Sequence, residues 1–144
     1  MTRFLLDVNI LVPLIDPEHA FFEKAHDWFA SIEGQTWLTC PITQNGAVRT
    51  VCQPRYPTGP ASVVDAVASM GTITTSAHHK FIADDISLLN NAWVDTSKLT
   101  SHKQITDTYL LALATHHRAT FVTFDKHVVV SSVKSPHASL LVVV

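Results

Sequence analysis

The segment from residue 105 to residue 125 constrains the fold most strongly, because a helix pattern and a strand pattern follow each other directly. Its first half, ITDTYLLALATHH, is rich in strong helix formers, with Thr106 as a candidate N-cap and Asp107 at the positive end of the helix dipole. The run TFVTF then predicts a buried strand that ends at Asp125. In an open parallel sheet, strand ends and helix N-termini line the ligand crevice, so both acids are expected at one site.

The same order of apolar strand and acid occurs at the N-terminus, where Phe4-Leu5-Leu6 is followed by Asp7. Propensity and apolar spacing predict further strands at 36–40, 78–82 and 139–144. Helices are predicted at 18–33, from Pro41 to about Val51, at 61–70, and at 84–92 with Asp84 and Asp85 as its capping acids. Strands that alternate with helices indicate an α/β sandwich with a mainly parallel sheet.

Composition favours one compact domain spanning residues 1–144, with 47% apolar and 15% charged residues. The formal charge of −2 gives no overall attraction to nucleic acid or anionic membrane, so local groups must hold any polyanion. Cys40 and Cys52 lack CxxC spacing and fit inert thiols in a reducing compartment. No apolar run reaches about 18 residues, so we expect a soluble, cytoplasmic protein without a membrane partner.

Asp7, Asp107 and Asp125 share one placement, at the edge where a strand ends or a helix begins. Carboxylates brought together there raise one another's pKa unless a cation lies between them. Mg²⁺ and Mn²⁺ prefer such oxygen ligands, and a metal held this way can activate water and stabilise a phosphate under attack. These three residues are therefore candidate metal ligands for phosphodiester hydrolysis.

Several neighbouring residues are candidates for supporting roles. Asn9, Thr106 and Thr123 can hold an acid or a water, although each is also a common capping residue. The cations expected to meet a phosphate backbone are Arg49, Arg55 and Lys126.

Other catalytic classes lack their motifs. The nine histidines include no HExxH and no cysteine at zinc spacing, so we expect solvated or core-edge roles for them. The chain also contains no GxSxG, no Walker loop and no GxGxxG, which argues against acyl transfer and nucleotide binding.

Five segments resemble PIN-domain ribonucleases, most closely the VapC-like toxins of bacterial toxin–antitoxin pairs: LLDVN, CPITQNGAVR, FIADDISLL, ITDTYLLALA and VTFD. They occur in the family's order over nearly the whole chain. The resemblance implies a PIN-like three-layer sandwich, Mg²⁺- or Mn²⁺-dependent endoribonuclease activity, a homodimer, and inhibition by an antitoxin whose tail enters the active site. It also places Asp7, Asp107 and Asp125 on acidic site positions.

Gln44 departs from the family pattern, which usually has Glu at this point. The amide keeps one acceptor oxygen but loses the negative charge, so metal affinity should fall. Natural divergence and a deliberate substitution both fit this change. Gln44 is thus expected to be a weakened fourth member of the catalytic group.

Two alternatives remain open at this stage. A phosphatase of the haloacid dehalogenase type is suggested by Asp7-Val8-Asn9, but that chemistry needs a second Asp where this chain has Asn9. A PIN-like protein that binds RNA or an antitoxin without cutting is suggested by Gln44.

Overall fold

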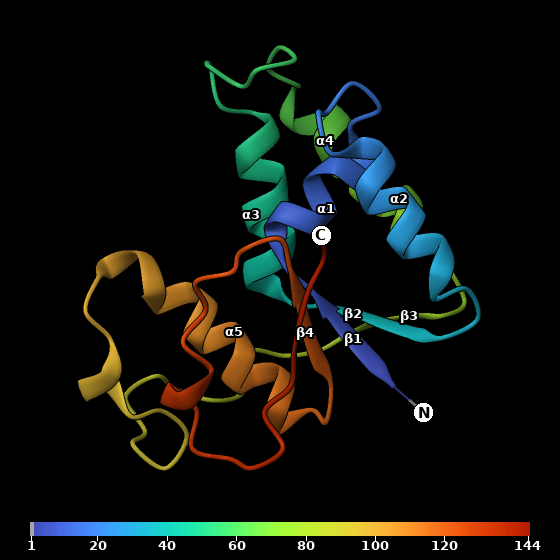
Figure 1. Ribbon diagram of the computed structural model, residues 1–144. Coiled ribbons are helices and arrows are strands. Elements are labelled where there is room, and N and C mark those ends of the chain that lie inside the picture. Colours follow the sequence, from blue (N-terminus) through green and yellow to red (C-terminus); the bar gives the residue numbers. More distant parts are fainter. Residues whose placement is uncertain (1) are drawn as a thin grey trace.

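A computed structural model describes residues 2–144 and contains a five-stranded sheet in which all pairings are parallel (Figure 1). The strand order is β3-β2-β1-β4-β5. The strands are β1 (Arg3–Leu6), β2 (Thr36–Thr39), β3 (His79–Phe81), β4 (Thr120–Thr123) and β5 (Leu140–Val142). The predicted α/β class is confirmed, and the sheet is parallel throughout.

Helices cover both faces of this sheet. Figure 1 shows α1 to α4 on one side and α5 on the other. The helices are α1 (Val8–Ile15), α2 (Phe22–Ser31), α3 (Pro41–Val51), α4 (Val63–Thr74) and α5 (Ile105–His116), with short 3₁₀ turns η1 (Thr96–Lys98), η2 (His102–Gln104) and η3 (Val130–Ser132). The three-layer sandwich is thereby confirmed.

Two hydrophobic clusters fill the space between the layers, and alternate residues of each strand enter opposite clusters. In β1, Leu6 belongs to the cluster under α1 to α4, whereas Leu5 belongs to the cluster under α5. Trp37 and Leu38 divide in the same way in β2. This alternation follows from the two-residue period of a strand, and burial on both faces explains why the strands read as continuous apolar runs.

The start of α5 differs from the sequence prediction. The helix begins at Ile105 and continues directly from η2, whose cap is Ser101. Ser101 and Gln104 form a capping box, so the chain turns into the helix before it reaches Thr106. Thr106 is exposed in the first turn, and its predicted role as the N-cap is wrong.

The predicted helix at 84–92 is also wrong, because this segment forms turns and loop. The side chains of Ser87 and Asn90 each accept a hydrogen bond from the backbone N–H two residues further on. Such local bonds compete with helical ones. Asp84 and Asp85 therefore cap no helix, and the Asp85 carboxylate instead faces His116 and His117.

Other boundaries moved by a few residues. α1, for which no helix was predicted, continues through Pro13 to Ile15. α2 begins at Phe22 rather than near residue 18, because Asp16 holds the preceding turn by accepting from the backbone N–H of Glu18. α4 extends beyond Met70 to Thr74. The predicted strands lie where expected, within one or two residues.

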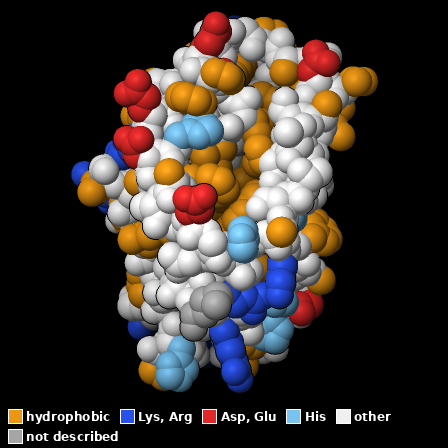
Figure 2. Space-filling view, turned by 90° about the vertical axis from the view of Figure 1, so that its right-hand side faces the viewer, with side chains coloured by type: hydrophobic (Ala, Val, Ile, Leu, Met, Phe, Trp, Pro, Cys, Tyr) orange, Lys and Arg blue, Asp and Glu red, His pale blue; other side chains and the backbone are white. Residues whose placement is uncertain are grey.

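One face of the surface carries an apolar hollow. Figure 2 shows it on the face that carries α2, with lysine and arginine side chains gathered near its lower end. A hollow of about 430 Å³ lies beside the end of α2 and is lined in part by Phe29, Ile32 and Trp37.

Within residues 2–144, none of the helices has the length and apolar character that a bilayer crossing requires.

Gly46 allows α3 to approach α1 closely. A Cβ built at Gly46 would lie 2.5 Å from Cγ2 of Val8, whose branched side chain has little rotamer freedom in a helix. We therefore expect Gly46→Ala to lower the free energy of unfolding by about 1–2 kcal/mol, since overpacking outweighs the gain in helix propensity. Urea unfolding followed by circular dichroism measures the change.

Gly71 in α4 provides a matched control, because a Cβ there meets no atom within 4 Å. Gly71→Ala should raise the free energy of unfolding by about 0.5–1 kcal/mol through helix propensity alone. If both substitutions stabilise the protein, close contact between α1 and α3 does not limit residue 46.

Candidate active site

The fold brings the three predicted acids to one edge of the sheet. Asp7 follows β1 and caps α1, and Asp125 follows β4, which pairs directly with β1. Asp107 lies in the first turn of α5. All three line a single open pocket of about 730 Å³ at the carboxyl ends of the strands. This is the region of a parallel sheet where ligands generally bind.

Asp7 is the most buried of these acids, with 6% of its surface exposed. One carboxylate oxygen accepts a hydrogen bond of 2.7 Å from the backbone N–H of Val8, and the other accepts one of 2.7 Å from the Thr123 hydroxyl. Burial raises the pKa of Asp7 above its usual range, and the nearby Asp125 raises it further, while the two hydrogen bonds act in the opposite direction. The fold thus holds the Asp7 carboxylate in a fixed orientation.

Asn9 and Thr123 connect the ends of β1 and β4. The Asn9 amide donates to the Thr123 hydroxyl oxygen at 3.0 Å and accepts from the backbone N–H of Phe124 at 3.2 Å. The backbone N–H of Asp125 also donates to the Thr123 hydroxyl oxygen, at 3.0 Å. Thr123 therefore contacts the Asp7 carboxylate and the Asp125 backbone, and Asn9 holds Thr123 in place. Thr106 makes no such contact among the hydrogen bonds of residues 2–144.

The pKa of Asp107 responds to burial and to both of the other acids. Its pKa is raised to about 7, first by burial, then by the charge of Asp7, and then by a hydrogen bond and charge interaction with Asp125. Like charges in a partly desolvated site oppose one another's ionisation. The pocket therefore favours either a shared proton or a cation among its carboxylates.

Gln44 lies at the same edge of the sheet but faces another partner. Its amide donates at 2.9 Å to the hydroxyl oxygen of Thr39, the last residue of β2. The Thr39 hydroxyl also lies 2.7 Å from Nε2 of His79. Gln44 is not among the described residues that line the acidic pocket. No local sequence pattern indicates this Gln44–Thr39–His79 chain, because its members come from three separate elements.

The predicted phosphate-binding cations are scattered. Arg55 lines the acidic pocket and is exposed to solvent. Lys126 is an exposed neighbour of Asp125. Arg49 lies in a different hollow, between α3 and α4. Only Arg55, of these three, contributes to the lining of the pocket as described.

Two aromatic residues of the pocket escaped the sequence analysis. The rings of Phe21 and Phe124 lie 5.3 Å apart, and Lys24 Nζ lies 5.3 Å and 5.0 Å from their centres. Phe21 is 46% exposed, so part of its ring is open to a ligand in the pocket. Phe124 could have been found from its position between the strand and Asp125. Phe21 could not, because it lies more than one hundred residues from Phe124 in sequence.

This arrangement agrees with a known family. The PIN domain family model matches residues 4–130. The chain belongs to the PIN-domain family. This PIN domain is 44% identical over 131 residues to Ribonuclease VapC44 of Mycobacterium tuberculosis, covering 91% of this chain and 92% of that protein. It is also 34% identical over 121 residues to Ribonuclease VapC39 of the same species, covering 84% and 87% respectively. It is thus a VapC-like member.

Solved structures support the same fold. The crystal structure of Mycobacterium tuberculosis VapC20, a Sarcin-Ricin loop cleaving toxin, matches with a TM-score of 0.58 and 15% identity, covering 82% of this chain and 86% of that one. VapBC2 from Rickettsia felis, crystallised with a DNA fragment from its promoter, matches with a TM-score of 0.60 and 13% identity. This match covers 97% of this chain and 98% of that one.

The residues of this pocket fit a divalent cation on chemical grounds. Three carboxylates supply the hard oxygen donors that Mg²⁺ and Mn²⁺ prefer. Burial, and then repulsion from the other two acids, raises the pKa of Asp107, and a cation among them would remove this penalty. The fixed oxygens of Asp7 and the open pocket leave room for waters and a phosphate group.

Asp107→Asn should make the stability of the cation-free protein less sensitive to pH. Because the folded-state pKa of about 7 exceeds the ordinary value of 3.8, the folded protein binds more protons between these two pH values. Stability should therefore fall as pH rises from about 4 to about 7, by on the order of 1–3 kcal/mol after allowance for solvent screening. Urea unfolding with a chelator present, at several pH values, measures this slope. An equal slope in the wild type and the variant would contradict the assigned cause.

Gln44→Glu should raise both divalent-cation affinity and RNA cleavage, because it adds a carboxylate at the edge that carries the other acids. The Thr39 hydroxyl, which accepts from Gln44, can instead donate to Glu at this position. A ribonuclease assay titrated with Mn²⁺ compares the two proteins, with Gln44→Ala as a control that lacks any ligand. Equal activity of the Gln and Glu forms at every concentration would show that residue 44 does not act on the metal.

Proposed function

We propose that this protein is the ribonuclease toxin of a toxin–antitoxin pair and hydrolyses RNA phosphodiester bonds with the aid of Mg²⁺ or Mn²⁺. The observation that carries the proposal is the meeting of Asp7, Asp107 and Asp125 in one pocket at the carboxyl edge of the sheet. The 44% identity to a protein named as a ribonuclease supports it.

The acids would hold the cation, which when bound lowers the pKa of water and stabilises charge on the phosphate. Asp7 is suited to this role because Val8 and Thr123 fix both of its oxygens. Asp125 is tied to the same strand end through its backbone N–H and Thr123. Asp107 approaches from a separate element, so the position of α5 on the sheet sets the spacing of the group.

The pocket also contains groups suited to single-stranded RNA. Arg55 can bind a phosphate at its rim. The partly exposed ring of Phe21, next to Phe124 and Lys24, offers an unpaired base an aromatic face beside a positive charge. Bases stack on such faces with little sequence preference, so this wall favours unpaired RNA as the substrate class.

We further propose that the protein binds a VapB-like antitoxin and a second copy of itself in the cytoplasm. The match to the structure of VapBC2 from Rickettsia felis, whose name joins VapB and VapC, supports the antitoxin part of this proposal. On α4, Val63, Val64 and Val67 are 62%, 78% and 54% exposed, and this apolar surface is available to a protein partner.

A second candidate function is binding of RNA or antitoxin without cleavage. It is favoured by the hydrogen bond that directs Gln44 to Thr39. The phosphatase alternative has less support, because Asn9 uses both ends of its amide to join Thr123 and Phe124. Such an amide supplies no acid for a phosphoryl-transfer step.

Asp7→Asn, Asp107→Asn and Asp125→Asn should each lower the rate of RNA cleavage by at least about 100-fold, since loss of a ligand should exceed the 10- to 100-fold cost of losing an outer-shell partner. The assay uses single-stranded RNA with Mg²⁺ or Mn²⁺, and chelation should stop cleavage by the wild type. Asp27→Asn, an exposed change on α2, is the matched control.

Isothermal titration of Mn²⁺ into the same proteins separates the two functions. Cation binding that disappears in the Asp107→Asn protein, without cleavage of RNA by the wild type, would favour the binding-only alternative. Cleavage that persists in all three Asn variants would exclude this pocket as the active site.

A further inference from the structure

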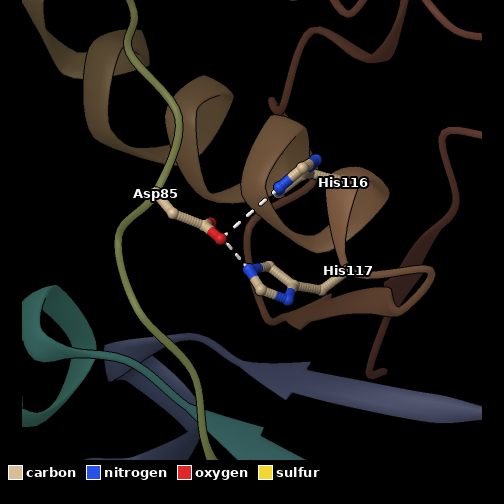
Figure 3. A group of neighbouring side chains, drawn as sticks. All are labelled: Asp85, His116 and His117. Carbon is tan, nitrogen blue, oxygen red and sulfur yellow. Dashed lines mark hydrogen bonds and ion pairs between the residues drawn. The ribbon is translucent and has the colours of Figure 1, made fainter.

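A second group of potential ligands lies at the other end of α5. His116 is the last residue of this helix and His117 is its C-cap, while Asp85 comes from the loop after β3. Figure 3 shows a ring nitrogen of each histidine turned toward the Asp85 carboxylate. His117 Nε2 lies 2.8 Å from one carboxylate oxygen, and His116 Nε2 lies 3.5 Å from the other.

This group is separate from the acidic pocket. Asp107 lies in the first turn of α5 and His116 in the last, nine residues later, which corresponds to about 14 Å along a helix. The histidines also precede β4, whereas Asp125 follows it. The two groups are therefore at opposite ends of the same helix–strand unit.

The spacing of the three side chains suits a small tetrahedral cation. One ligand atom from each residue lies within 4.8 Å of the other two. Among residues 2–144, Asp7, Asp107 and Asp125 do not form so close a group. Bonds of about 2.0–2.1 Å to zinc place two tetrahedral ligands about 3.3 Å apart. The observed nitrogen–oxygen distances of 2.8 Å and 3.5 Å lie on either side of this value.

The surroundings also favour a cation. The C-terminal end of a helix carries partial negative charge, and α5 ends at these histidines. The His116 ring packs edge-on against Trp93, with the ring centres 5.0 Å apart, which restricts its orientation. The side chains of Asp85, His116 and His117 are 43%, 36% and 19% exposed, so a fourth position would open to solvent.

We propose that Asp85, His116 and His117 form a second metal site that binds Zn²⁺ through two imidazole nitrogens and one carboxylate oxygen, with water as the fourth ligand. Two nitrogen donors select zinc-like cations over Mg²⁺, which prefers oxygen alone. The bound ion would join the loop that carries Asp85 and Trp93 to the junction between α5 and β4. Adjacent histidines paired with an acid 32 positions from His117 match no zinc spacing motif, so the sequence did not reveal the site.

Isothermal titration of ZnCl₂ into tag-free protein, with millimolar Mg²⁺ present to occupy the acidic pocket, tests the proposal. One equivalent of Zn²⁺ should bind, and His117→Asn, His116→Asn and Asp85→Asn should each weaken binding by at least about 100-fold. His102→Asn, an exposed histidine on η2, should bind Zn²⁺ as the wild type does. Equal affinity in the wild type and in all three ligand variants would overturn the proposal.

Nuclear magnetic resonance of the wild-type protein gives a test that does not depend on the folding of a variant. Addition of Zn²⁺ should shift the Nε2 signals of His116 and His117 and leave those of His102 and His137 unchanged. At a Zn²⁺ concentration of 100 times Kd, Tm should rise by roughly 5–10 °C. If the signals of His116 and His117 do not shift, these two histidines only contact Asp85 directly and do not bind Zn²⁺, which would overturn the proposal. Neither result bears on RNA cleavage, so this site and the proposed ribonuclease can fail separately.

Discussion

The structure depends on a buried carboxylate at the junction of its two central strands. Asp7 is nearly inaccessible to water, yet no Lys or Arg forms an ion pair with it among the described residues. Its charge is balanced by the Val8 N–H at the start of α1, which Asp7 caps, and by the Thr123 hydroxyl. Burial of an acid on these terms opposes folding at neutral pH. Its placement is readily explained if the site exists to hold a cation, since the cation removes the same penalty.

The hydrogen bonds around Asp7 also explain why β1 and β4 must be neighbours. Thr123 reaches across from β4 to Asp7, and Asn9 reaches back from α1 to Thr123 and Phe124. This network fixes two of the three acids to adjacent strand ends. The third acid, Asp107, depends on the packing of α5 against the opposite face of the sheet, where Leu110, Leu111 and Leu113 are fully buried.

The sequence predicted most of this arrangement because strand ends and helix starts are local signals. An apolar run that stops at an acid was enough to place Asp7 and Asp125, and the start of α5 was enough to place Asp107 beside them. Predictions from local patterns were wrong where a neighbouring side chain formed a competing hydrogen bond with the backbone. Ser101 moved the helix start upstream of Thr106, and Ser87 with Asn90 replaced a predicted helix by turns. No local pattern in the sequence indicates partners that lie far apart in the chain, such as Thr39 and His79 or Asp85 and His117.

Both edges of the sheet end in short strands. β3 and β5 have three residues each, whereas the three inner strands have four. So short an edge presents few free backbone groups to a strand from another molecule, which discourages both aggregation and strand addition. A protein that associates with this chain should therefore dock on its helices through side chains, and mutations that alter association should cluster on helical faces rather than along the sheet margin.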